Sequence, residues 1–244
     1  RCKMITTLHK FYSKEDYITF SKTETFDPTY FMVSTGISDK DYDRLTSICD
    51  SIPVNWICID IANGYISNLV TFCKKVRDKY PDKTIVAGNV VTREMVEDLI
   101  LTGGVDIVKI GIGPGSASAV IECADAAHGV GGHIISDGGI TCPGDMAKAF
   151  GGGADFVMVG GQFAGHDQNP GEIIEENGKF FQMFYGMSSQ HAMEKHYGKM
   201  NSYRASEGRH LKIKYKGPLE NTILDYLGGL RSTCTYINAR TIKE

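Results

Sequence analysis

The sequence predicts an α/β fold of the (β/α)8 TIM-barrel type. Short apolar runs alternate with stretches of helical character over 244 residues, a length that suits one barrel domain. The last two apolar runs, residues 133–139 and 156–161, each end on a pair of glycines. Loops after the last two strands of such barrels commonly bind phosphate, because glycines let backbone N–H groups approach it. We therefore expect a barrel that binds a nucleotide or a sugar phosphate.

Seven strands are predicted from these apolar runs. Most runs are apolar throughout, which is typical of parallel strands that are covered on both faces. The predicted strands are residues 4–9, 31–36, 56–62, 84–90, 107–113, 133–139 and 156–161. A closed barrel has eight strands, and an open sheet would expose an apolar edge. Because the phosphate loops follow the last two runs, the first βα unit is expected to be the one that the sequence lacks.

Helix signals separate the predicted strands. Residues 39–45 carry acids in their first turn, and residues 92–100 begin at Thr92, a good N-cap residue. Residues 142–150 place a proline in the first turn, and residues 219–230 are the expected last barrel helix. This alternation of strands and helices predicts parallel βαβ units.

One barrel domain is expected over residues 1–244, with an insertion at about residues 165–210 between the last strand and the last helix. Residues 172–185 have the pattern of a hairpin that turns at Asn177-Gly178, and residues 211–215 alternate like an exposed strand. Loops after barrel strands lie on the catalytic face, so the insertion is interpreted as a flap.

Composition argues against several classes of function. The net charge of −3 gives no basic field that would attract nucleic acid or a membrane surface, and no apolar run approaches the ~20 residues of a membrane span. The seven cysteines are odd in number and lack C-x-x-C spacing, which favours reduced thiols in a cytoplasmic protein over disulfides or a zinc site.

Four groups of residues are candidates for binding or chemistry. The glycine pairs 138–139 and 160–161 are the phosphate candidates, and Asp137 could accept hydrogen bonds from a ribose diol or form an Asx turn. Segment 111–116 could offer carbonyl groups to a monovalent cation, although a tight turn explains it equally well. The remaining groups are residues 203–208, which also fit a charged surface loop, and residues 60–64 with Lys10 at the barrel mouth.

Together these motifs resemble the GMP reductase family, which shares a superfamily with IMP dehydrogenase. The matching segments are residues 60–65, 87–92, 111–116, 136–139, 184–189, 203–208 and 231–236, in family order. The dehydrogenase usually carries an inserted regulatory domain and a longer flap with an Arg-Tyr pair. Here the insertion carries Arg204-Ala205-Ser206-Glu207-Gly208, which is the reductase pattern.

The resemblance implies an NADPH-dependent oxidoreductase that converts GMP to IMP and ammonia in purine nucleotide salvage. In this family a cysteine thiolate attacks C2 of the purine, ammonia leaves, and hydride from NADPH then releases the sulfur. Glu207 matches the catalytic acid that helps proton transfer to the departing amine, together with a threonine. The resemblance also suggests a homotetramer.

The resemblance further implies which residues hold the ligands. The GMP positions are Ser116, Asp137, Gly138, Gly139, Gly160, Gly161, Gly186, Met187, Ser188, Arg204, Ala205, Ser206, Glu207 and Gly208. The NADPH positions are Lys10, Asp60, Ile61, Ala62, Ile112, Gly113, Tyr203, Ser232, Thr233, Cys234 and Thr235. The carbonyl groups of Gly113 and Gly115 match ligands of a potassium ion.

The sequence departs from the family at the nucleophile. In the family, the Gly-Pro-Gly-Ser segment is followed, one residue later, by the catalytic cysteine and then by Thr-Arg in a mobile loop. Here Ala117 runs directly into Ser118. Cys142, near a helix start beyond the first phosphate loop, is the least unsuitable substitute, whereas Cys123 is expected to be packed and Cys234 matches a cofactor position.

Three other functions stay open on sequence grounds. IMP dehydrogenase would differ in reaction direction and cofactor. A catalytically inactive nucleotide-binding homologue would lack the cysteine loop, as this sequence does. A sugar-phosphate isomerase would explain the phosphate loops but not residues 204–208.

Overall fold

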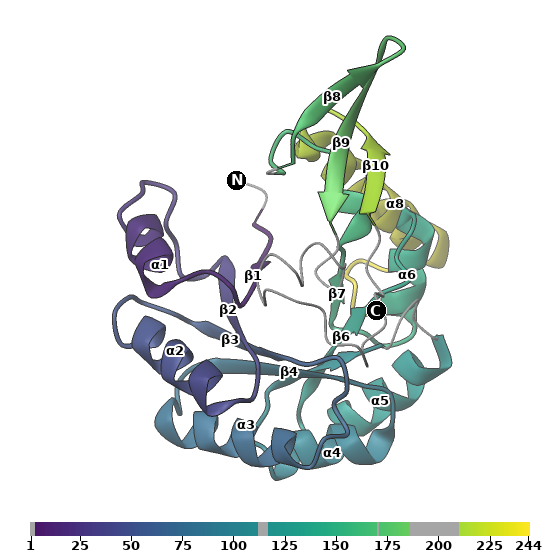
Figure 1. Cartoon of the computed structure of the whole chain (residues 1–244). Coiled ribbons are helices and arrows are strands. Elements are labelled where there is room, and N and C mark those ends of the chain that lie inside the picture. The colour runs from purple at the N-terminus through teal and green to yellow at the C-terminus, as the bar shows by residue number, and fades with distance from the viewer. Residues whose placement is uncertain (1–2, 112–116, 170, 186–209) are drawn as a thin grey trace.

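The fold is a curled sheet of seven parallel strands, seen in a computed structural model that describes residues 3–111, 117–169 and 171–185 and residues 210–244 (Figure 1). Each strand pairs with the next one in sequence, so the order is β1-β2-β3-β4-β5-β6-β7. The strands are β1 (Thr6–Leu8), β2 (Phe31–Thr35), β3 (Trp56–Asp60), β4 (Thr84–Val90), β5 (Ile107–Ile110), β6 (His133–Asp137) and β7 (Phe156–Met158). This curled half-barrel confirms the predicted α/β barrel architecture.

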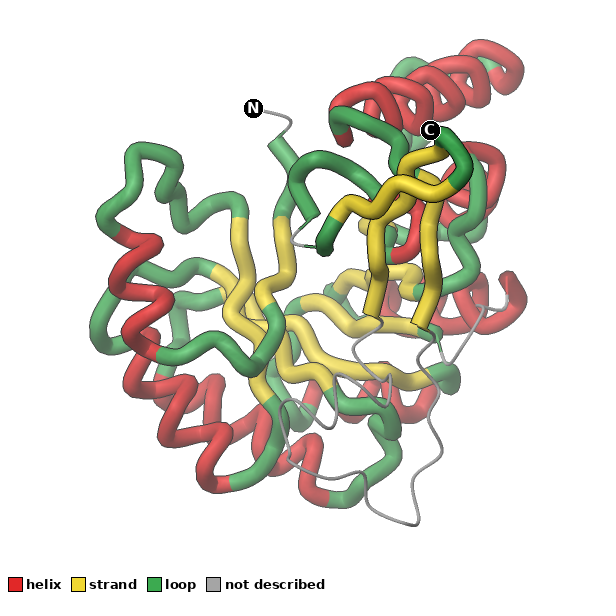
Figure 2. Tube along the Cα trace, turned by 45° about the horizontal axis from the view of Figure 1, so that its top comes forward, coloured by secondary structure: helices red, strands yellow, loops and turns green. Residues whose placement is uncertain are grey.

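Helices connect successive strands and lie on the outside of the curled sheet (Figure 2). Ser38 begins the helix after β2 with a capping box: its hydroxyl accepts the N–H of Asp41, and the Asp41 carboxylate accepts the N–H of Ser38. Thr92 is the N-cap residue of α4 (Arg93–Leu101), as predicted, but its side chain makes no cap hydrogen bond. These helices are α1 (Lys14–Ser21), α2 (Asp39–Cys49), α3 (Asn68–Lys79), α4 (Arg93–Leu101), α5 (Ala117–Gly129) and α6 (Pro143–Gly151).

Alternation along the strands divides the apolar side chains between two cores. One core lies between the strands and the helices and includes Ile57 and Val108, both fully buried. The smaller core lies on the inner face and consists of Met32, Cys58, Val86, Ile107 and Ile135. Because side-chain direction has a period of two, the positions two residues beyond Cys58, Ile107 and Ile135 also face inward. Those positions are the polar ends of β3, β5 and β6.

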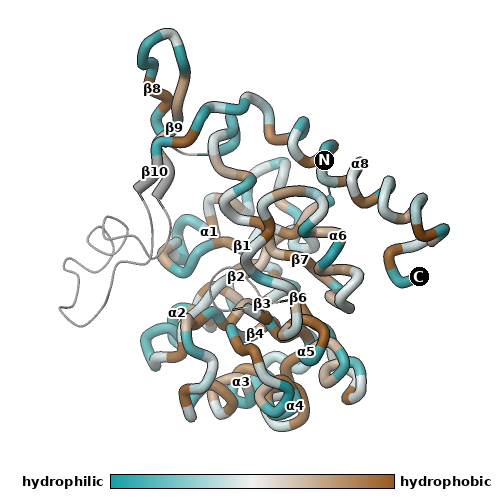
Figure 3. Tube along the Cα trace, turned by 90° about the vertical axis from the view of Figure 1, so that its right-hand side faces the viewer, coloured by the Kyte–Doolittle hydropathy of each residue, from teal (hydrophilic) through white to brown (hydrophobic). Residues whose placement is uncertain are grey.

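A second, antiparallel sheet lies between β7 and the last helix. Its strands are β8 (Ile173–Glu176), β9 (Lys179–Tyr185) and β10 (His210–Lys214), in the order β10-β9-β8. Asn177 (φ 52°) and Gly178 (φ 71°) form the predicted hairpin turn, with hydrophilic residues at its tip (Figure 3). Strand β7 is shorter than predicted, since it ends at Met158 and a 3₁₀ turn follows at Gly161–Phe163.

The last helix, α8 (Leu219–Ile237), continues past Gly228-Gly229, where the sequence predicted its end. Gly229 serves the packing of this helix and does not end it. A Cβ atom on Gly229 would lie 2.4 Å from Cβ of Pro143, at the start of α6. The glycine therefore lets α8 approach α6 closely inside a continuous helix.

Among the described residues, no helix combines the length and the apolar character that crossing a membrane requires.

Candidate functional site

The carboxyl ends of β3, β4, β5 and β6 each contribute one polar side chain to a single network. Lys109 Nζ lies 3.0 Å from Asp60 Oδ1 and 2.9 Å from Asp137 Oδ2. Asn89 Nδ2 donates to the same Asp137 oxygen over 2.9 Å and to the carbonyl of Gly111 over 2.7 Å. These contacts join Asp137 Oδ2 to side chains of β4 and β5, so this oxygen interacts across the sheet and does not form the Asx turn that the sequence left open.

Lys109 is the buried member of this network. Its side chain is 5% exposed, against 51% for Asp60 and 24% for Asp137. Burial by itself would lower the pKa of the ammonium group, but the neighbouring Cys58, Asp60 and Asp137 outweigh burial and raise the pKa above its usual value. Lys109 is therefore a permanent cation at neutral pH, and it neutralises charge between two carboxylates.

Gly88 allows the lysine to reach across β4. In the strand register, Asp60 pairs with Gly88, and Gly88 pairs with Lys109. A Cβ atom on Gly88 would lie 2.7 Å from Lys109 Cβ and 2.5 Å from the Lys109 carbonyl oxygen. The missing side chain at residue 88 thus leaves the inner face open for the ion pair between β5 and β3.

Replacing Gly88 with alanine should lower the free energy of unfolding by about 1–3 kcal/mol, the usual cost of overpacking. Gly129→Ala is the matched control, because a Cβ there meets nothing within 4 Å and should change stability by less than about 0.5 kcal/mol. Urea unfolding followed by circular dichroism measures both. Equal midpoints for the two variants would contradict the steric role of Gly88.

The two predicted phosphate loops lie side by side. Strands β6 and β7 are paired, with Asp137 opposite Met158, so the loops that follow them share one edge of the sheet. Gly138 (φ 97°) and Gly139 (φ 74°) have left-handed backbone conformations that other residues rarely adopt. Around Gly160 and Gly161 the space is open, since an added Cβ would meet nothing within 4 Å. This edge of the sheet therefore offers glycines in left-handed backbone conformations, together with open space for an anion.

Other predicted positions are divided between this edge and α8. Lys10 follows β1, and Ile61 and Ala62 follow β3, where the Ile61 N–H donates to the carbonyl of Gly88 over 2.9 Å. Helix α8 instead holds Ser232, Thr233, Cys234 and Thr235. This helix packs against α6, which contacts β7, the edge strand at the other side of the sheet from β1. The predicted positions outside the described residues are Ile112, Gly113, Gly115, Ser116, Gly186, Met187, Ser188, Tyr203, Arg204, Ala205, Ser206, Glu207 and Gly208.

Two members of the network, Lys109 and Asn89, were not predicted as site residues. The signal for Lys109 is a single lysine inside the apolar run 107–110, at an inward position of a buried strand. Lysine is almost never fully buried unless it is paired, so such a lysine predicts carboxylates on the neighbouring strand ends. Asn89 gave a weaker signal, because an asparagine at a strand end also fits a turn.

Four of the described thiols are unsuited to nucleophilic attack. Burial raises the pKa of Cys49 and Cys123 to about 11, and that of Cys58 and Cys73 to about 12. Such thiols hold little thiolate at neutral pH. Cys123 is packed within α5, as the sequence predicted, whereas Cys142 is exposed at the N-cap of α6.

The sequence of this chain matches a family model and several known proteins. Residues 27–244 match the model described as IMP dehydrogenase / GMP reductase domain. The chain is 55% identical to GMP reductase 1 of Mus musculus over 256 residues, which cover 99% of this chain and 74% of the relative. It is 54% identical to GMP reductase 1 of Homo sapiens and to the GMP reductase of Klebsiella pneumoniae, with the same coverage.

The alignment with the mouse relative has 256 positions, which is 12 more than the 244 residues of this chain. The relative therefore carries at least 12 residues, inside the aligned region, that have no counterpart here. A loop missing after Ala117 would account for such positions.

Proposed function

This chain belongs to the IMP dehydrogenase / GMP reductase family, a family of oxidoreductases, and we propose that it forms the nucleotide- and cofactor-binding barrel of a GMP reductase. The proposed reaction converts GMP and NADPH to IMP, ammonia and NADP+, in purine nucleotide salvage. One structural observation carries the proposal: the network around Lys109 lies at the same edge as two adjacent glycine loops.

The GMP half of the proposed site uses β6 and β7. Asp137 accepts hydrogen bonds from the ribose diol, and its ion pair with Lys109 fixes the carboxylate in place. The backbone N–H groups of the two glycine pairs hold the phosphate, for which the left-handed backbone at Gly138 and the open space at Gly160 give support. Motif matches add Ser116, Gly186–Ser188 and Arg204–Gly208 to this half.

The cofactor half of the proposed site uses the loops after β1 and β3. Asp60 is joined through Lys109 to Asp137, so the proposed NADPH and GMP positions are neighbours. This adjacency fits the reaction, in which bound NADPH supplies the hydride that reaches C2 of the purine. The contribution of Ser232–Thr235, the potassium ion on Gly113 and Gly115, the homotetramer and the cytoplasmic location stay predictions from the motifs.

Replacing Gly160 with valine should weaken GMP binding about 10- to 100-fold, because the side chain blocks charge-assisted hydrogen bonds to the phosphate. The free protein has room for the side chain, since an added Cβ at Gly160 meets nothing within 4 Å. The backbone there has φ −110° and ψ −82°, outside the regions that valine favours, so circular dichroism checks that the variant is folded. Calorimetry measures GMP affinity. Gly129→Val, at the end of α5, is the control with unchanged affinity.

Gly138→Val should weaken GMP binding as well, but it adds backbone strain at φ 97°. Unaltered affinity in the Gly160 and Gly138 variants together would remove the phosphate assignment.

Glu207→Gln should keep GMP affinity and lower turnover by about 10²- to 10⁴-fold, the usual effect of losing a general acid. The measurement is steady-state NADPH oxidation by a variant of this chain in which the family's cysteine loop is inserted after Ala117. Unchanged turnover would take Glu207 out of the mechanism.

A second candidate function is that of an inactive nucleotide-binding homologue, which the direct Ala117–Ser118 junction favours. Such a protein would bind GMP with the same residues but would have no nucleophile. IMP dehydrogenase is distinguished by its substrates, since it would oxidise IMP.

A further inference from the structure

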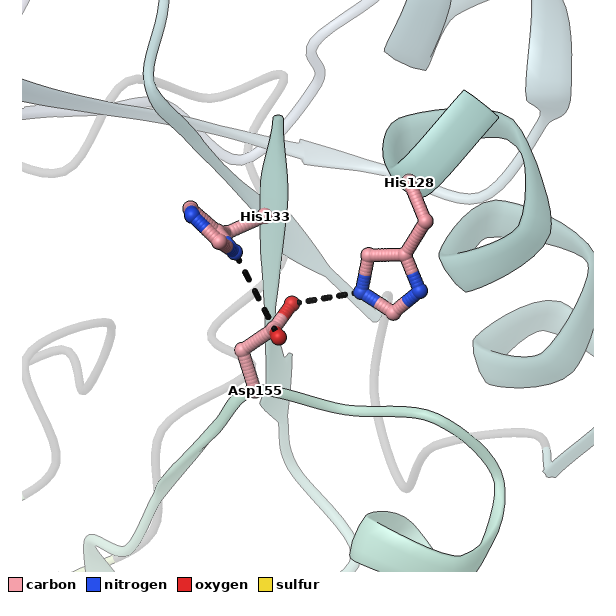
Figure 4. A group of neighbouring side chains, drawn as sticks. All are labelled: His128, His133 and Asp155. Atoms are coloured by element: carbon pink, nitrogen blue, oxygen red, sulfur yellow. Dashed lines mark hydrogen bonds and ion pairs between the residues drawn. The ribbon is translucent and has the colours of Figure 1, made fainter. Parts of the chain in front are cut away.

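At the amino ends of the strands, on the opposite edge from the Lys109 network, two histidines flank one carboxylate (Figure 4). His128 Nε2 lies 2.9 Å from Asp155 Oδ2, and His133 Nδ1 lies 3.4 Å from Asp155 Oδ1. His128 belongs to the last turn of α5, His133 is the first residue of β6, and Asp155 directly precedes β7. The end of α5 and the amino ends of the paired strands β6 and β7 thus bring three potential metal ligands together.

The carboxylate is held in position before any ion binds. The Asp155 side chain is only 4% exposed, and its Oδ2 accepts the backbone N–H of Ile134 over 2.9 Å. A backbone hydrogen bond of this kind orients ligating carboxylates in metal sites. The turn at Gly131 (φ 80°) lets the chain reverse between α5 and β6, so that the two imidazoles reach the same carboxylate.

The distances suit a small divalent ion. The ligand atoms of His128, His133 and Asp155 all lie within 4.8 Å of one another. Ligands placed about 2.1 Å from a tetrahedral Zn²⁺ stand about 3.4 Å apart. The histidine side chains are 40% and 54% exposed, so their rings can rotate toward an ion without disturbing the core.

We propose that His128, His133 and Asp155 form a binding site for a divalent transition-metal ion of the Zn²⁺ type. Two imidazole nitrogens and one carboxylate oxygen are a donor set that Zn²⁺ accepts, and three protein ligands leave a position open. A cavity of about 680 Å³ adjoins the cluster and is lined in part by His133, Asp155 and Lys243. Water from this cavity completes the coordination.

Lys243 is the competing cation. Its ammonium group forms an ion pair with Asp155 Oδ1, and its side chain is 69% exposed. Such exposed lysines form weak, exchangeable ion pairs. An incoming ion therefore displaces Lys243, and removing this lysine should favour the ion.

The test is metal titration of purified, tag-free protein after treatment with a chelator. Zn²⁺ is titrated against a chromogenic chelator, and Co²⁺ is followed by its visible absorption. We expect one equivalent of ion with nitrogen and oxygen ligands. His128→Gln and His133→Gln should each weaken binding at least about 10-fold, and Lys243→Met should tighten it about two- to fivefold.

Asp125→Asn is the matched control, because this exposed acid lies on the same helix but pairs with Arg93 outside the cluster. Its metal affinity should equal that of the unmodified protein. Circular dichroism checks that each variant is folded. If the histidine variants do not fold, Lys243→Met decides, since the proposal requires a gain in affinity.

Three results would overturn the proposal. They are the absence of saturable metal binding by the unmodified protein, metal affinities of both histidine variants equal to that of the unmodified protein, and a sulfur-to-cobalt charge-transfer band. The last would place the ion on cysteines.

Discussion

A chain in which Ala117 runs directly into Ser118 should bind GMP but leave NADPH unoxidised, because it lacks the family's cysteine at that position. The buried thiols cannot replace it, since burial raises the pKa of Cys58 to about 12 and that of Cys123 to about 11. Inserting the corresponding loop of the mouse GMP reductase after Ala117 should increase turnover by up to about 10⁶-fold, the scale on which enzymes depend on a nucleophile.

The control for this insertion is the same loop with its cysteine replaced by serine, which should bind GMP and stay inactive. NADPH absorbance with and without GMP is the measurement for both proteins. Turnover by the chain without the loop would contradict the need for this cysteine. Cys142→Ser would then test whether the exposed thiol at the start of α6 is the nucleophile.

Replacing Lys109 with methionine should lower the free energy of unfolding by about 2–3 kcal/mol and weaken GMP binding. Breaking a buried ion pair typically costs about 3–5 kcal/mol, and the partial exposure of Asp60 and Asp137 reduces that cost. The raised pKa of Lys109 determines how its contribution to the free energy of unfolding depends on pH. Its stabilising effect is fully present below the unfolded pKa of about 10.4 and is lost only as pH rises through the higher folded value.

Urea unfolding and GMP calorimetry at neutral pH measure the two effects. Lys74→Met is the control, because Lys74 pairs with Asp78 at the surface and should contribute less than about 1 kcal/mol. Adding Asp137→Asn to Lys109→Met should recover part of the lost stability, since one unpaired carboxylate is removed. A Lys109→Met protein as stable as the unmodified one would contradict the electrostatic role of this lysine.

Local signals in the sequence predicted the barrel strands, the hairpin turn at Asn177-Gly178 and the proline at the start of α6, because each depends on near neighbours. The length of α8 was underestimated, because Gly229 is needed for contact with Pro143, which is 86 positions earlier in the numbering. Helix ends set by tertiary packing do not appear in local sequence.

The sequence likewise predicted some residues of the candidate site and missed others. Asp60, Asp137 and the glycine pairs stand at strand ends, where sequence alone can find them. Lys109 joins the two carboxylates only through the register of β3, β4, β5 and β6. The cluster of His128, His133 and Asp155 likewise depends on how α5, β6 and β7 meet, and its spacing matches no metal motif.

The proposed reaction is tested most directly by an assay with GMP and NADPH on the variant that carries the cysteine loop. A GMP reductase should show GMP-dependent loss of NADPH absorbance, with one ammonia and one IMP formed for each NADPH oxidised. Failure to bind GMP, or conversion of IMP with NAD+ to an oxidised purine and NADH in place of this reaction, would contradict the proposed function.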